Sequence, residues 1–95
     1  MARFDANGKK DFITKDFKGD LITIYVDGDY GGGDLNIFAS AGTIQAQVVD
    51  GGTFNETNVD SFGNPKKRIV IAGRAEKITL ELSGATNPDL VVEVI

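Results

Sequence analysis

Three aspartates in a glycine-rich segment come nearest, in type and spacing, to a chemical site. Asp27, Asp29 and Asp34 lie within the segment DGDYGGGD, and calcium prefers carboxylate oxygens as ligands. The EF-hand calcium loop requires an oxygen ligand at its fifth position and a Glu at its twelfth. Here those two positions hold Gly31 and Phe38. We therefore expect a structural turn with no metal or cofactor, shaped by Asp side chains and by glycines of positive φ.

Other kinds of catalytic or ligand site are disfavoured by the residues that the sequence lacks. It contains no His and no Cys, which excludes triads built on these residues and the usual zinc sites. The glycine-rich segment leads into a predicted strand, whereas a phosphate-binding loop precedes a helix. The acidic residues lie mainly in turns or at outward strand positions such as Glu81 and Glu93. We expect a protein that is not an enzyme.

Length and charge further restrict the classes of protein to which this chain can belong. A chain of 95 residues is the size of one domain. Its net charge of -4 disfavours nucleic-acid binding, which needs clustered basic residues. The one basic run, Lys66-Lys67-Arg68, is interpreted as a solvated loop before a strand. No apolar run reaches the roughly 20 residues that span a bilayer, and the N-terminus lacks the apolar region of a signal peptide. We expect synthesis in the cytoplasm and no membrane partner.

Short runs of alternating or β-branched residues, separated by glycine-rich turns, predict strands along most of the chain. Alternation places Ile44, Ala46 and Val48 on one face of a strand. It does the same for the apolar residues of Lys77–Leu82. No window keeps the apolar period of a helix. The predicted strands are residues 21–27, 34–40, 43–50, 67–72, 76–83 and 89–95.

Six or seven short strands in one small domain predict an all-β fold, an antiparallel β-sandwich or jelly-roll-like barrel. Leu21–Val26 and Leu90–Ile95 are apolar on both faces. A single half-buried sheet cannot cover both faces, so two packed sheets are expected.

Residues 1–18 differ in composition from the rest and are predicted to form an extended N-terminal arm, with the sandwich occupying residues 19–95. Charged residues are dense there, and Phe4, Phe12 and Phe17 are spaced among them. A mobile terminus is the plainer alternative. We expect the three Phe side chains to dock on a neighbouring protein rather than on the core of their own domain.

Three further aromatic residues lie in predicted turns and loops. Tyr30 stands in the glycine-rich turn, and Phe54 and Phe62 lie in the longest predicted loop, residues 51–66. Aromatic side chains in such positions can anchor a protein partner or stack on a sugar. Packing into the core is the alternative for each of them.

The turn and strand sequences resemble small β-sandwich modules of tailed-bacteriophage virion proteins. The segment Gly28–Gly33 is similar to their G-[ST]-[FY]-G-G-[AG] turn, and Asp34–Ile37 to the alternating strand that follows it. Val48–Phe54 resembles their v-v-d-g-x-f step. Ile78–Ala85 resembles their l-x-l-S-G-A step. The modules often carry a D-G-x-W segment after the second strand, and this chain has no Trp.

The resemblance implies a structural protein of the virion with no catalytic residues. Its simplest form is a capsid decoration (cement) protein on the head exterior, with the major capsid protein, other virion proteins or further copies of itself as partners. The alternative is a carbohydrate- or receptor-binding module of the fibre type.

Overall fold

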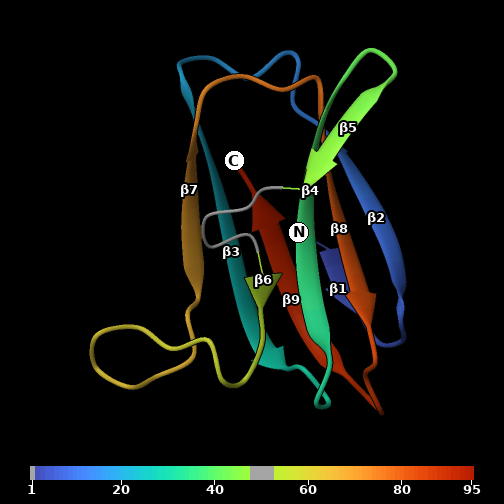
Figure 1. Cartoon of the computed structure of the whole chain (residues 1–95), viewed down its shortest axis with the longest axis vertical. Coiled ribbons are helices and arrows are strands. Elements are labelled where there is room, and N and C mark those ends of the chain that lie inside the picture. The colour runs from blue at the N-terminus through green and yellow to red at the C-terminus, as the bar shows by residue number, and fades with distance from the viewer. Residues whose placement is uncertain (1, 48–52) are drawn as a thin grey trace.

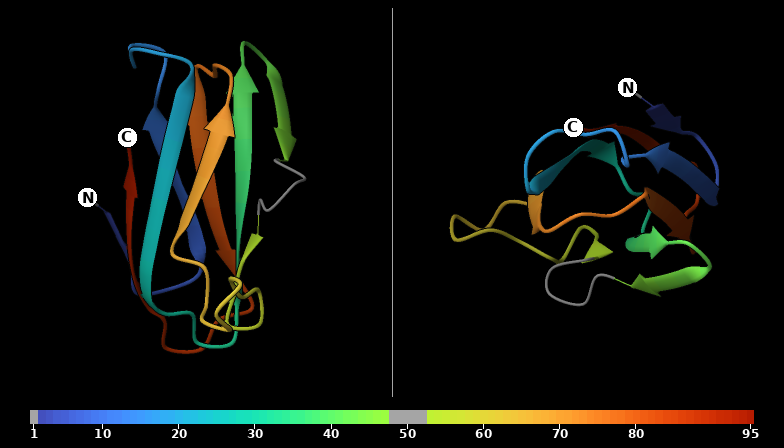
Figure 2. Two further views of the ribbon diagram at one scale, coloured as in Figure 1. Left: turned by 90° about the vertical axis from the view of Figure 1, so that its left-hand side faces the viewer. Right: turned by 90° about the horizontal axis from the view of Figure 1, so that it is seen from above.

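The computed structural model describes residues 2–47 and 53–95, which form two antiparallel sheets packed face to face (Figures 1 and 2). The first sheet has the strand order β1-β9-β3-β7, and the second has the order β2-β8-β4-β5 with β6 also paired to β4. The strands are β1 Ala2–Phe4, β2 Gly8–Ile13, β3 Leu21–Asp29, β4 Asp34–Ala41, β5 Ile44–Gln47, β6 Thr53–Phe54, β7 Arg68–Ala72, β8 Lys77–Ser83 and β9 Asp89–Val94. The predicted all-β sandwich is confirmed, whereas its jelly-roll form stays a prediction.

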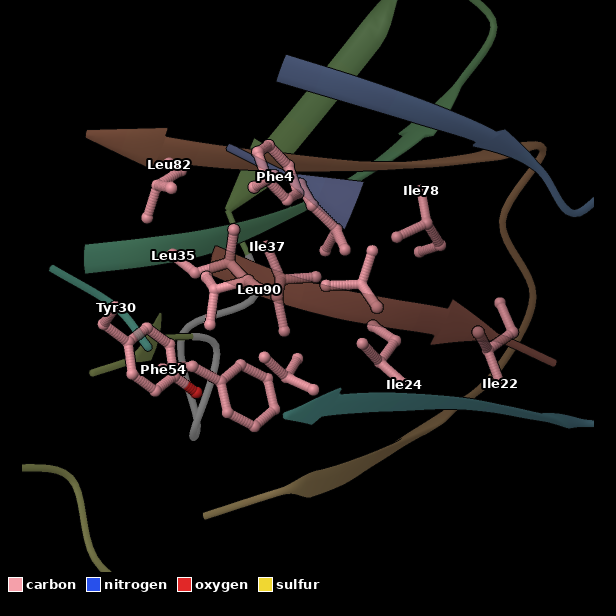
Figure 3. Close-up of a cluster of buried hydrophobic side chains, with 13 residues drawn as sticks. Phe4, Ile22, Ile24, Tyr30, Leu35, Ile37, Phe54, Ile78, Leu82 and Leu90 are labelled. Atoms are coloured by element: carbon pink, nitrogen blue, oxygen red, sulfur yellow. The ribbon is translucent and has the colours of Figure 1, made fainter. Parts of the chain in front are cut away.

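The core lies between the sheets, and alternation along the strands explains its membership (Figure 3). In a strand, successive side chains point to opposite faces, so every second residue of β3 and β4 faces inward. Buried aliphatic side chains from both sheets meet there. They are Ile22, Ile24 and Val26 of β3, Leu35 and Ile37 of β4, Ile78, Leu80 and Leu82 of β8, and Leu90 and Val92 of β9.

The predicted N-terminal arm is wrong for residues 2–13, because they form strands of both sheets. β1 pairs with β9, placing Phe4 opposite Leu90, and β2 pairs with β8 along six residues. Phe4 is buried, and Phe12 and Phe17 are partly buried against the same core. These three Phe side chains therefore stabilise their own domain.

Two of the charged residues that suggested an arm, Lys9 and Asp11, lie on the solvent side of β2 and form cross-strand pairs with β8. Lys9 Nζ lies 3.6 Å from Glu81, and Lys77 Nζ lies 3.8 Å from Asp11. The hydroxyl of the buried Thr79 also donates to Asp11 at 2.7 Å. A charged outer face is compatible with an edge strand, where it opposes pairing with other chains.

The predicted strands from residue 21 onward appear with small shifts of their ends, except at β5. The described part of β5 is exposed throughout, so Ile44 and Ala46 face solvent, and Val48 lies outside the described residues. In contrast, Ile78, Leu80 and Leu82 share a buried face as predicted. Within residues 2–47 and 53–95, no helix has the length and apolar character needed to cross a bilayer.

Candidate protein-binding surface

The glycine-rich turn between β3 and β4 uses its aspartates as local hydrogen-bond acceptors. Asp29 Oδ1 accepts from the Gly31 amide at 2.8 Å, and Asp27 Oδ1 from the Gly28 amide at 2.9 Å. Asp34 Oδ1 accepts from the side-chain amide of Asn55 at 2.9 Å. Across the described chain, no three or more acidic, His or Cys side chains are grouped so as to hold a metal ion. The turn geometry accounts for these aspartates.

Tyr30 belongs to the core, although its place among glycines suggested an exposed residue. Its side chain is 4% exposed and lies with Phe54 among the buried residues (Figure 3). The pKa of the Tyr30 hydroxyl is raised to about 12, mainly by burial and to a lesser extent by the nearby charge of Asp27. Both effects disfavour the ionised phenolate. Tyr30 therefore acts as a neutral aromatic that closes one end of the core.

The six aromatic residues predicted to bind partners thus divide sharply by exposure. Phe4, Tyr30 and Phe54 are buried, and Phe12 and Phe17 pack partly against the core. Only Phe62 among the six is exposed. The prediction that these residues anchor a partner is therefore wrong for most of them, because their side chains already pack within their own domain.

A group of exposed apolar side chains lies instead on the outer side of the first sheet. In the first part of β3, the residues that alternate with the core residues are Leu21, Thr23 and Tyr25, and they point outward together. Leu21 is 58% exposed and Tyr25 42%. β3 has neighbours on both sides in the sheet, so outward residues of β7 and β9 extend this surface sideways.

The register brings further apolar side chains beside those of β3. Thr23 stands opposite Val70 of β7. On its other side, Thr23 exchanges two backbone hydrogen bonds with Ile95, of 2.7 and 2.9 Å. Val70 and Ile95 are 47% and 59% exposed. We define the apolar face as these side chains together: Leu21, Thr23, Tyr25, Val70 and Ile95.

Charged residues border the apolar face at one end. Tyr25 stands in register between Arg68 of β7 and Glu93 of β9. Beyond Tyr25 in the direction of the β3–β4 turn, Lys67 Nζ lies 3.4 Å from Asp27 Oδ1. A shallow depression of about 250 Å³ beside Tyr25 is lined by several of these residues. An apolar centre with a polar rim is the usual composition of a protein interface.

No family model, curated protein or solved structure matches this chain. The chemistry of the apolar face therefore has to be derived from its own residues. The apolar face consists of three aliphatic side chains, one threonine and one tyrosine. What it offers a partner is apolar area.

The apolar face was missed by the sequence analysis, although one signal for it was present. Leu21–Val26 is apolar on both of its faces, and that pattern was interpreted as a need for two packed sheets. In the structure the second sheet covers only the inner face of β3. The remaining apolar residues stay at the surface, where Val70 and Ile95 join them.

Proposed function

We propose that this chain is a non-enzymatic structural protein that binds another protein through the apolar face. The supporting observation is the contiguity of Leu21, Tyr25, Val70 and Ile95 on one side of a sheet. Single exposed apolar side chains are ordinary, whereas a contiguous patch is typical of an interaction site. Burial of one such side chain contributes roughly 1.5–3 kcal/mol.

The specific form that we propose is a bacteriophage capsid decoration protein, located in the virion and bound to the major capsid protein or to other virion proteins. Two features support it: the sequence resemblance to virion β-sandwich modules and the exposure of the apolar face. A symmetric particle presents many copies of one binding site. Avidity between linked contacts then compensates for a small interface.

The structure offers less to the alternative of a carbohydrate-binding module. Such a module needs exposed aromatic rings on which a sugar can stack. Tyr30 and Phe54, two of the aromatic residues considered for that role, are buried. Tyr25 stands between Arg68 and Glu93 rather than beside a second exposed ring of the same face.

The proposal is tested with particles of the virus that encodes the chain. Mass spectrometry of purified virions should find the protein, and particles stripped of it should bind the isolated protein again at saturable, symmetry-related sites. Absence of the protein from purified virions would contradict its assignment to the virion. Failure to bind stripped particles would contradict its assignment to the particle surface.

A further inference from the structure

Phe62 is the most exposed large apolar side chain of the described residues. It is 87% exposed and lies in the connection between β6 and β7, which extends away from the two sheets (Figure 1). A phenyl ring in water is unfavourable in free energy, since its apolar area gains from burial. The proposed function does not use this residue.

The segment that carries Phe62 is held by hydrogen bonds, and we call it the Phe62 turn (residues 58–66). The amide of Lys66 donates to the carbonyl of Asn58 at 3.1 Å, and the amide of Asp60 to that of Asn64 at 2.8 Å. Asp60 Oδ1 accepts from the amides of Phe62 and Asn64, at 2.8 and 3.1 Å. A residue held in this way loses little conformational freedom when it binds a partner.

A shallow apolar depression of about 360 Å³ lies at the other end of the first sheet, and we call it the Leu21 depression. It is lined by Phe17, Lys18, Leu21, Val94 and Ile95. Its mainly apolar lining and its size suit an aromatic ring. Leu21 and Ile95 are among the most exposed apolar residues of the described chain, so this depression is open to a partner.

The Phe62 turn cannot fill the Leu21 depression of its own chain. The turn joins β7 at Arg68, whereas Leu21 stands opposite Ala72 at the far end of the same strand. Four residues of extended strand separate these ends by roughly 13 Å. The turn also projects outward from the side of the sandwich (Figure 2).

We propose that Phe62 of one copy inserts into the Leu21 depression of a second copy. The charges beside the two surfaces are complementary, since Asp60 stands two residues from Phe62 and Lys18 lines the depression. The contact joins two different surfaces, so a pair of copies keeps one Phe62 turn and one Leu21 depression unoccupied. Such head-to-tail contacts build rings or open chains. The inference rests on the proposed function only in that the depression shares Leu21 and Ile95 with the apolar face.

Sedimentation velocity across a concentration series up to about millimolar tests the contact. The wild-type chain should form species larger than a monomer as concentration rises. Phe62→Ser and Ile95→Lys should each remain monomeric over the same range. Ile44→Ser is the matched control, because Ile44 is 73% exposed on β5 of the other sheet, and it should associate as the wild type does. The thermal midpoint of each variant verifies that it is folded.

Mixing the two monomeric variants gives the sharpest result. Phe62→Ser keeps an intact depression and Ile95→Lys keeps an intact Phe62 turn, so an equimolar mixture should form dimers and nothing larger. A wild-type chain that stays monomeric, a Phe62→Ser variant that associates normally, or a mixture without dimers would each overturn the inference. Self-association without particle binding would contradict the proposed function alone, and particle binding by a strictly monomeric chain would contradict this inference alone.

Discussion

Gly31 and Gly42 have the same backbone conformation but very different surroundings. Both have φ of 60°, yet a Cβ at Gly31 would lie 2.4 Å from the carbonyl oxygen of Thr86, and one at Gly42 would have no atom within 4 Å. Gly42→Ala should cost about 1–2 kcal/mol from left-handed strain alone. Gly31→Ala should cost a further 1–3 kcal/mol or so, since the backbone must move to relieve the overlap. Urea denaturation followed by circular dichroism measures both, and equal costs would contradict the packing described for this turn.

Tyr30 should make stability fall in alkaline solution. Its pKa is raised to about 12 in the folded protein by burial and then by Asp27, whereas an unfolded tyrosine has a pKa of about 10. The folded state therefore keeps the Tyr30 proton to a higher pH than the unfolded state does. The stabilisation that follows from this difference is complete below pH 10 and is lost as the pH rises from 10 to 12. Thermal midpoints at pH 9 and 11 should differ less for Tyr30→Phe than for the wild type. Identical alkaline decreases would show that the phenol does not cause the loss.

At the scale of the elements, β1 and β2 complete the sandwich. Phe4→Ala should cost about 3–5 kcal/mol, since it leaves a cavity between the sheets. Phe62→Ala is the control for the same chemical change at an exposed position, and it should alter stability by less than about 0.5 kcal/mol. Deletion of residues 1–18 should lower the thermal midpoint strongly. A deletion variant with an unchanged midpoint would show that these strands are dispensable.

The strands from residue 21 onward could be predicted because alternation and glycine-rich turns are local signals. The clearest example is β8, in which Ile78, Leu80 and Leu82 share one buried face. β2 could not be found in this way, since Lys10 stands beside Phe12 on the inward face and breaks its apolar pattern. The pairing of Lys9 and Asp11 with β8 becomes visible only once the strands are side by side. β6 has two residues, Thr53 and Phe54, which is too short for any periodicity.

The candidate surface was less predictable than the fold. The outward residues of β3 are adjacent in sequence and could have been grouped. Val70 and Ile95 join them only through the register of β7 and β9 with β3, and register between distant strands is not encoded in local alternation. The composition of the turn also led to the wrong prediction that Tyr30 is exposed. Glycines beside an aromatic residue do not reveal whether its ring points inward.

At the scale of the whole molecule, the two sheets differ in what they present to solvent. The second sheet carries the charged outer side of β2, with Lys9 paired to Glu81. The first sheet carries the apolar face, with charged residues beside Tyr25 at one end and Lys18 beside Leu21 at the other. A molecule with one apolar side is suited to lie flat against a larger assembly. The central claim is therefore that binding occurs through this side.

Cosedimentation with stripped particles, comparing two lysine variants, tests that claim most directly. Val70→Lys places a charge within the apolar face, and Ile44→Lys places the same charge at an exposed strand position of the other sheet. Val70→Lys should weaken binding at least about tenfold, equivalent to about 1.4 kcal/mol, while Ile44→Lys binds as the wild type does. Wild-type binding by Val70→Lys, or equal losses in both variants, would contradict the account.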